Sequence, residues 1–190
     1  RKDTRSPLIE QFPERSRFQL SSLLRTMDAT KDEQRLVRRE LHRCSLSVPV
    51  IARLQTIPGI GAVVARTLAA WIVDPGRFKS FSALSAYAGL GLKQDISNWR
   101  AVHRAHASKR GQRAVKRALY LAARAALHAG QNAFAKRYQA RIAAGWEDRK
   151  AIRDIARKIL FCACRLWTSK EEYDDGRINT FAPATALSVR

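Results

Sequence analysis

Acidic residues are scarce in this sequence. Across 190 residues, 36 lysines and arginines stand against 16 aspartates and glutamates, which gives a formal net charge of +20. A charge excess of this size is unlike that of an ordinary cytosolic enzyme and indicates a polyanionic partner. Because 46% of the residues are hydrophobic, the chain can still bury a core, which excludes a wholly disordered basic tail. We therefore expect a folded basic protein.

Long apolar runs and paired cysteines are also missing. The apolar stretches at 68–73 and 118–129 are short or interrupted, well below the roughly 20 residues of a membrane span. No signal-peptide core follows the basic opening residues. The three cysteines, Cys44, Cys162 and Cys164, show no CxxC spacing and no nearby histidines. We expect no membrane partner, and reduced thiols that serve as small core side chains.

Strand-like alternation is absent, and helical periodicity dominates, so the sequence predicts an all-α fold. Residues 1–48 are expected to form a charged helical hairpin or coiled-coil segment, with two helices over 15–46 and a turn at Asp28-Ala-Thr30. Residues 49–175 are expected to form a helical domain, and 176–190 an irregular tail. Within the domain the pattern predicts helices at 50–57, 62–73, 80–88, 110–129, 132–143 and 148–167, and a loop at 89–108.

The segment 54–68 has the form of a helix-hairpin-helix, with Pro58-Gly59-Ile60-Gly61 between two helices. Glycines at 59 and 61 would let backbone N–H groups approach a phosphate, and the following helix would present its positive dipole end. Ile57, Ile60 and Leu68 are expected to hold the helices together, with Ala65 at their crossing. The alternative is a turn that only folds the domain.

Cations are concentrated between Lys93 and Arg117, where Asp95 is the single carboxylate. Arg113, Lys116 and Arg117 recur at helical spacing and should share one face, whereas Ala114, Leu119, Leu121 and Ala122 can turn inward. The candidate nucleic-acid-binding residues are Gly59, Gly61, Arg100, Arg104, Lys109, Arg110, Arg113, Lys116 and Arg117. A solvated basic surface is the alternative. Trp99 could stack on a base or anchor the loop.

No metal-binding or nucleophile motif is evident, and the acidic residues are scattered along the chain. His103 and His106 lie three residues apart without a third ligand nearby, so we expect them to contact phosphate or solvent and not a metal. No cofactor and no metal site are therefore expected in this chain.

Several motifs in consistent order resemble one family. Ile57-Pro-Gly59-Ile-Gly61 is followed by Arg77-Phe78, by Ser82-Ala-Leu-Ser-Ala-Tyr-Ala-Gly89-Leu90, by Ser108-Lys109-Arg110-Gly111, and by Ala156-Arg157-Lys158-Ile-Leu160 with a closing Tyr173-Asp174. From about Gln55 to Asp175 the chain resembles the carboxy-terminal half of the "IS one-ten" insertion-sequence transposases, which include Piv-type DNA invertases. The helices before Pro49 are similar in position to the coiled-coil segment of that family.

The resemblance implies a mechanism. In the family, a RuvC-like domain supplies four carboxylates for Mg²⁺, and the carboxy-terminal domain supplies a serine that forms a phosphoserine–DNA intermediate. The serine lies in a Ser-Ser-Gly motif. Counting forward from Gly89-Leu90 places Ser97 on its second serine, whereas counting back from Ser108 places Ser97 on the first. Ser97 is therefore the candidate nucleophile, with a turn-forming or helix-capping serine as the alternative.

Three hypotheses follow for the function. The first is the DNA-binding, nucleophile-bearing domain of a transposase or site-specific recombinase, located in the bacterial cytoplasm with the nucleoid, with Mg²⁺ bound by the RuvC-like domain. The second is a non-catalytic nucleic-acid-binding module, a decayed or domesticated fragment that contacts backbone phosphates only. The third is a basic assembly protein. The expected partners are DNA, a guide (bridge) RNA as some family members use, and a second copy through the helices before Pro49. Since the sequence begins with Arg1, we expect a longer native protein.

Overall fold

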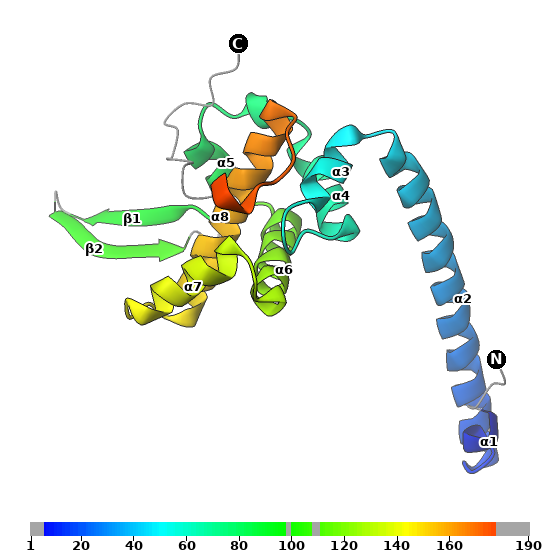
Figure 1. The fold of residues 1–190 in the computed structure, drawn as a ribbon. Helices are drawn as coiled ribbons and strands as arrows, with labels where there is room; N and C mark the ends of the chain where they lie inside the picture. Colours follow the sequence, from blue (N-terminus) through cyan, green and yellow to red (C-terminus); the bar gives the residue numbers. More distant parts are fainter. Residues whose placement is uncertain (1–5, 98–99, 108–110, 178–190) are drawn as a thin grey trace. The chain divides into compact units, whose positions relative to one another are not determined.

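A computed structural model describes residues 6–97, 100–107 and 111–177 of the chain. The chain separates into two compact units, Arg1–Ser47 and Val48–Arg190. In both units the principal elements are α-helices, so the helical fold class predicted from the sequence is confirmed (Figure 1).

One long helix makes up most of the first unit. α1 spans Ser6–Ile9 and α2 spans Glu14–Leu46. The predicted turn at Asp28-Ala-Thr30 is wrong, because these residues contain no glycine or proline and continue the helix. The Thr30 hydroxyl bonds back to the carbonyl of Thr26 at 2.7 Å, and Lys31 lies 4.0 Å from Asp28. A helical hairpin is therefore not formed. The single helix α2 leaves the other predicted form, a coiled-coil segment, as the alternative.

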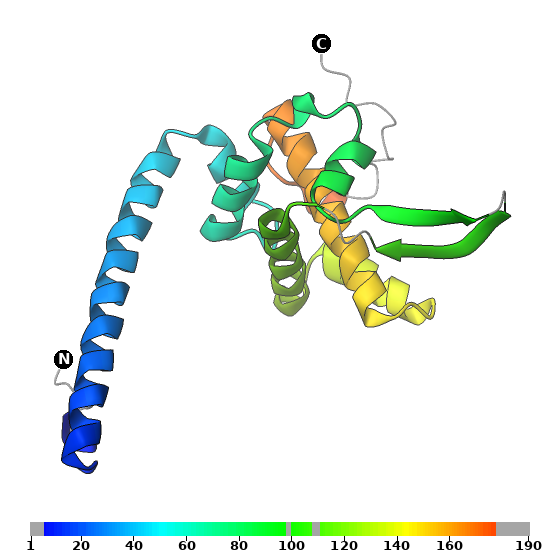
Figure 2. The same cartoon turned by 180° about the vertical axis from the view of Figure 1, so that it is seen from behind.

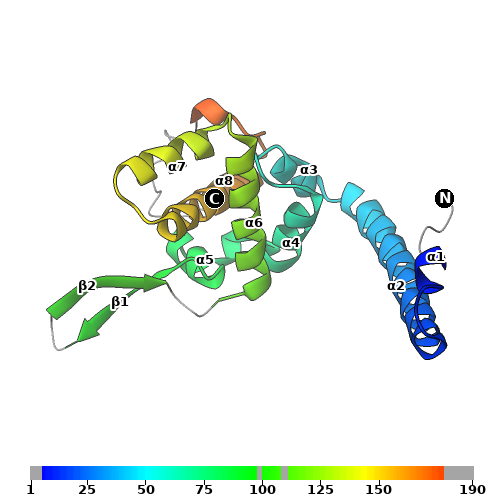
Figure 3. The ribbon, with the colours of Figure 1, turned by 90° about the horizontal axis from the view of Figure 1, so that it is seen from below.

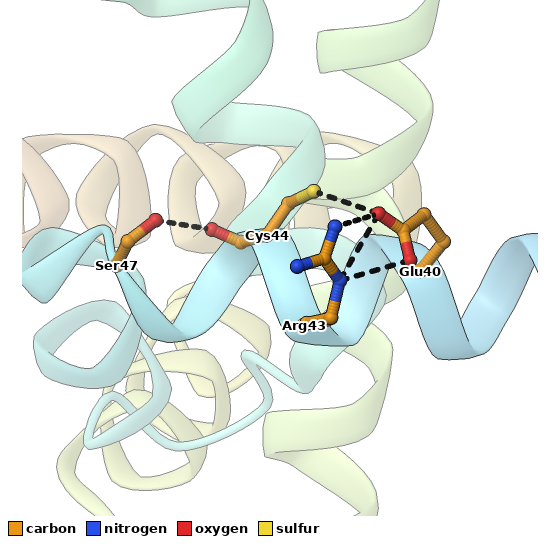
Figure 4. A network of polar contacts seen from close by, with 4 residues as sticks. All are labelled: Glu40, Arg43, Cys44 and Ser47. Carbon is orange, nitrogen blue, oxygen red and sulfur yellow. Dashed lines mark hydrogen bonds and ion pairs between the residues drawn. The ribbon is translucent and has the colours of Figure 1, made fainter.

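The last turns of α2 carry a local polar network (Figure 4). Arg43 Nε donates to both carboxylate oxygens of Glu40, at 3.2 and 3.0 Å. This hydrogen bond is the main cause that lowers the pKa of Glu40 below its ordinary value. The Ser47 hydroxyl donates to the carbonyl of Cys44 at 2.8 Å, which pairs one of the carbonyls left free at a helix end. The contacts are made within the helix end itself.

The second unit is a helical body arranged around α8. Its helices are α3 (Pro49–Gln55), α4 (Ala62–Ile72), α5 (Phe81–Tyr87), α6 (Arg113–Ala129), α7 (Ala133–Ala143) and α8 (Asp148–Ser169). α8 packs against α3, α5, α6 and α7, and Figure 2 shows it within the body from the opposite side. Its apolar positions, including Ile155, Ile159 and Ala163, are fully buried. Over the described residues, no helix is both long enough and apolar enough to cross a membrane.

The segment 89–108, predicted as a loop, contains an antiparallel hairpin. β1 (Leu92–Ser97) pairs with β2 (Arg100–Ala107), and the register shifts between Gln94 and Ile96. The ribbon extends away from the helices (Figure 3). The two strands carry little strand signal in their sequence, because Ala, Asp and Lys have low β-propensity and Ile96 and Val102 are the only β-branched residues in them. Their apolar residues also form no regular alternation.

Candidate nucleic-acid interface

α6 places the predicted basic residues on its outer side. Arg113 and Arg117 are exposed and Lys116 is half-buried, while Val115, Leu119 and Ala122 are fully buried against the body. Arg124, further along the helix, is also exposed and extends the same face. Leu121 departs from its expected inward position, because it is 54% exposed. α6 therefore separates an apolar inner face from a cationic outer face.

No carboxylate among the described residues pairs with these α6 cations. In the second unit, Asp154 pairs with Arg137 and Arg141 of α7 instead. Arg113, Lys116 and Arg117 thus keep their charge available for an external anion, as a phosphate-binding face requires.

The glycine turn joins α3 to α4, and its two glycines have different surroundings. Gly59 has φ +88°, and a Cβ there would lie 2.1 Å from the carbonyl oxygen of Ala122 and 2.7 Å from the N of Ala126. The close approach that Gly59 permits is therefore to the backbone of α6. Gly61 is the N-cap of α4, and among the described residues no atom lies within 4 Å of the place that a Cβ on Gly61 would occupy.

The apolar residues expected to hold α3 and α4 together do so. Ile57, Ile60, Ala65 and Leu68 are all buried, with Ala65 and Leu68 fully inaccessible. Since the turn also rests on α6, the start of α4 is held in a fixed relation to the cationic helix. Gly61 is the glycine of the pair whose surroundings leave room for a ligand.

The hairpin carries the candidate nucleophile at its far end. Ser97 is the last residue of β1 and pairs directly with Arg100, the first of β2. Arg104 falls where the register shifts. At about 3.3 Å per residue, Ser97 lies about 17 Å along the ribbon from Leu92. Lys109, Arg110 and Trp99 lie outside the described residues.

The candidate residues therefore form two groups. Ser97 and Arg100 are neighbours at the hairpin end, whereas Arg113, Lys116 and Arg117 follow the hairpin on α6. The end of α5, before the hairpin, is tied to the start of α6, after it, by a 2.7 Å hydrogen bond from the N–H of Gln112 to the carbonyl of Tyr87. The sequence alone does not separate these groups, because nothing in it indicates the two strands.

The structure adds one set of cations that the sequence analysis does not single out. Arg149, Lys150, Arg153 and Arg157 lie on the first half of α8. The spacing of four residues between Arg149, Arg153 and Arg157 is the signal that could have shown that they share one helical face. Cations are more concentrated along the chain between Lys93 and Arg117, so charge density directs attention to that stretch and not to α8.

The cysteines and acidic residues form no catalytic arrangement in the described part of the chain. Cys162 and Cys164 are buried and Cys44 is exposed, all as free thiols. Burial raises the pKa of Cys162 to about 11 and that of Cys164 further still. No group of three or more His, Cys, Asp or Glu side chains that could hold a metal ion occurs among the residues described.

The second unit is thus a helical domain with a cationic outer helix and a glycine turn. Comparisons with known proteins specify it. Residues 51–139 match the family described as "Transposase IS116/IS110/IS902 family". The chain is also 29% identical over 108 residues to an "Insertion element IS110 uncharacterized 43.6 kDa protein" of Streptomyces coelicolor, covering 57% of this chain and 26% of that protein.

The helical domain of this chain thus belongs to the IS116/IS110/IS902 transposase family. The aligned part of the chain spans about a quarter of the length of this curated relative.

Proposed function

We propose that this chain is the DNA-binding, nucleophile-bearing part of a transposase or site-specific recombinase that acts in DNA transposition or inversion. The observation that carries the proposal is the family match over residues 51–139, which includes the glycine turn, the hairpin with Ser97 and the cationic face of α6. In this proposal Gly61, Arg113, Lys116 and Arg117 contact backbone phosphates, together with Arg100 and Arg104 of β2 and with Lys109 and Arg110, which follow β2 in the sequence.

Salt dependence of DNA binding tests the proposal. If six to eight phosphates are neutralised, log Kobs should fall against log salt with a slope of about −5 to −7. The measurement is fluorescence anisotropy of a labelled duplex titrated with the protein at several salt concentrations. A flat salt response would overturn the proposal.

Ser97 is proposed as the nucleophile. Its hydroxyl gives up a proton, and Oγ attacks a backbone phosphorus. The Oγ–P bond forms while the bond from phosphorus to the departing deoxyribose oxygen breaks, and that oxygen takes up a proton. The phosphoserine conserves the phosphodiester for rejoining, which suits a recombinase. Arg100, paired with Ser97 across the hairpin, is a candidate for balancing phosphate charge. Mg²⁺ chemistry, by the family resemblance, would be supplied by a RuvC-like domain.

The test of Ser97 is covalent capture on DNA. In the full-length protein with Mg²⁺ and a cognate substrate, Ser97→Ala should abolish the covalent protein–DNA adduct seen after denaturing electrophoresis, while duplex binding is retained. An undiminished adduct would remove Ser97 from the mechanism. Duplex binding by a wild-type protein that forms no adduct would instead support the alternative, a non-catalytic nucleic-acid-binding module.

The partners of the first unit are also part of the proposal. No residue of α2 is buried, and Leu23, Met27, Val37 and Leu41 are each close to half exposed or more. We propose that a second copy covers this stripe as a coiled coil, in a cytoplasmic, nucleoid-associated assembly that can include a guide RNA.

Light scattering on nuclease-treated protein tests this part of the proposal. It should show a dimer that Leu23→Asp with Leu41→Asp dissociates, because the two carboxylates would be buried in the coiled-coil seam. A dimer that survives these changes would exclude α2 as the interface.

A guide RNA is tested separately. RNase treatment that leaves recombination unchanged would exclude the guide RNA.

A further inference from the structure

A second row of cations lies on the first half of α8. Arg149, Arg153 and Arg157 recur every four residues and so share one helical face, with Lys150 beside them. The opposite side of the helix is apolar, since Ile152, Ile155 and Ile159 are buried in the core. The row is not among the residues expected from the sequence to bind nucleic acid.

The nearest carboxylate does not neutralise this row. Asp154 accepts hydrogen bonds from Arg137 Nε at 2.9 Å and Arg141 Nε at 3.0 Å, both on α7. Burial alone would raise the pKa of Asp154, but the hydrogen bonds and charges of the two arginines outweigh it and lower the pKa. Asp154 is thus ionised and engaged by α7. No ion pair of Lys150, Arg153 or Arg157 occurs with any residue that the structure describes.

Aromatic rings hold two of these cations in place. Lys150 Nζ lies 4.3 Å from the centroid of the Trp146 ring, whose other cationic neighbour is Arg141 at 4.4 Å. The Arg157 guanidinium lies 5.7 Å from the Phe81 ring centroid. Such contacts restrict the side chains before any ligand arrives, which lowers the entropy cost of binding an anion.

The α8 row adjoins both parts of the proposed interface. A depression of about 80 Å³ is lined by Leu90, Trp146, Lys150, Arg153, Asp154 and Arg157, and Leu90 stands two residues before β1 at the root of the hairpin. On its other side lies Tyr120 of α6, about one turn from Lys116 and Arg117. Burial raises the pKa of Tyr120, and the nearby charge of Arg153 partly offsets that rise. α6 and α8 also pack directly against each other.

We propose that Arg149, Lys150, Arg153 and Arg157 form a second surface for the phosphate backbone of duplex DNA, continuous with the α6 cations and leading past the root of the hairpin. The inference rests on the proposed function, since DNA is taken as the partner. The arginine row extends over about 12 Å of the helix, at about 1.5 Å per residue. At about 3.4 Å per phosphate of one strand, that length covers about three or four phosphates.

The experiment measures the salt slope of duplex DNA binding by the full-length protein and its variants. Arg149→Gln with Arg153→Gln removes two charges without touching the ring contacts of Lys150 and Arg157. The slope should become less steep by about 2, at about 0.9 per lost phosphate contact. Lys79→Gln with Lys170→Gln removes two exposed cations elsewhere on the same unit and should leave the slope unchanged. Arg149→Lys with Arg153→Lys keeps both charges and should retain the wild-type slope.

The outcomes separate this inference from the proposed function. A wild-type slope near zero overturns both. The wild-type slope can be steep and become less steep in Arg113→Gln with Arg117→Gln, but stay unchanged in Arg149→Gln with Arg153→Gln. That result overturns the α8 surface alone. If the lysine pair flattens the slope as much as the glutamine pair, charge is not the cause and the inference fails. If the glutamine pair weakens binding of a structured RNA and leaves duplex DNA binding unchanged, the assignment to DNA is overturned.

Discussion

The hydroxyl of Tyr173 donates a 2.8 Å hydrogen bond to Oδ1 of Asp175, and both carboxylate oxygens of Asp175 accept from the N–H of Ala133 at 2.9 Å. Ala133 begins α7, so Asp175 pairs an N–H left free at the helix N-terminus and adds favourable charge there. The Tyr173 ring also stacks on Phe134, and the backbone N–H of Tyr173 donates to Thr56 Oγ1 at 3.0 Å. Tyr173 and Asp175 therefore tie the chain after α8 to α7 and to the glycine turn.

Tyr173→Phe should lower the free energy of unfolding by about 1–2 kcal/mol, because it removes a hydrogen bond to a carboxylate and keeps the stacked ring. The measurement is urea unfolding followed by circular dichroism. Tyr138→Phe is the matched control: its hydroxyl bonds to Asp148 at the surface, and its loss should cost less than about 0.5 kcal/mol. Equal losses in the two variants would contradict the link made by Tyr173.

Asp154→Asn should destabilise the second unit by about 1–3 kcal/mol at pH 7, because it leaves Arg137 and Arg141 without their carboxylate. The lowered pKa of Asp154 makes this contribution depend on pH. It is fully present above the unfolded pKa, near about 3.9, and is lost as the pH falls through the lower folded value. The stability difference between wild type and variant should therefore narrow below about pH 4. A difference that stays constant from neutral pH to about pH 3 would contradict this.

Gly59→Ala should lower the free energy of unfolding by about 3 kcal/mol or more. The new Cβ would overlap backbone atoms of α6, which a side-chain movement does not relieve, at a positive φ that alanine disfavours. Gly61→Ala, with φ −84° and open space around it, should change stability by less than about 1 kcal/mol. Thermal unfolding of both variants checks the pair. Similar melting temperatures would show that Gly59 is not pressed against α6.

Val73→Gly should leave stability unchanged or raise it by about 0.5–1 kcal/mol. Val73 has φ +60° and ψ −60°, with Asp74 N–H bonded to the Ile72 carbonyl, so a β-branched residue occupies a strained γ-turn. Its side chain is 65% exposed and contributes little burial. Val63→Gly on α4, where the residue is exposed and helical, is the control and should cost about 0.5–1 kcal/mol. Equal losses would argue against strain at Val73.

Titration with a thiol reagent should modify one cysteine in the native protein and all three after unfolding. Cys44 is exposed, while Cys162 and Cys164 are buried, and burial raises the pKa of both. The thiolate is the reactive form, so Cys162 and Cys164 are protected both by burial from the reagent and by a pKa that keeps them protonated. In the folded Cys44→Ser variant, the thiol reagent should modify no cysteine. Rapid modification of a second thiol in folded protein would contradict the packing of α8.

Most of the fold could be predicted from the sequence because its helices are amphipathic or bounded by Gly and Pro. The predicted helix at 132–143 lies within one residue of α7, and 148–167 within two of α8. The two failures have local causes. The polar composition of Asp28-Ala-Thr30 suggests a turn, although nothing in it prevents a helix. The hairpin escapes prediction because its pairing comes from backbone bonds between strands with weak propensity.

Less of the candidate site could be predicted. Spacing correctly places Arg113, Lys116 and Arg117 on the outer face of α6, since a helical period fixes direction. Sequence does not show that Gly59 faces α6, because that contact joins residues far apart along the chain. Nor does it show that α6 and α8 pack directly against each other, because that packing joins residues far apart along the chain.

The contact between Gly59 and α6 limits how this family can diverge. The backbone atoms that exclude a side chain at position 59 belong to residues 122 and 126, so no replacement of Ala122 by a smaller residue would make room. We therefore expect natural relatives with the same helix packing to keep glycine at this position independently of residue 122, while position 61 drifts among small N-capping residues. A relative with a larger residue at 59 should have α6 displaced from the turn, and with it the cations that α6 carries.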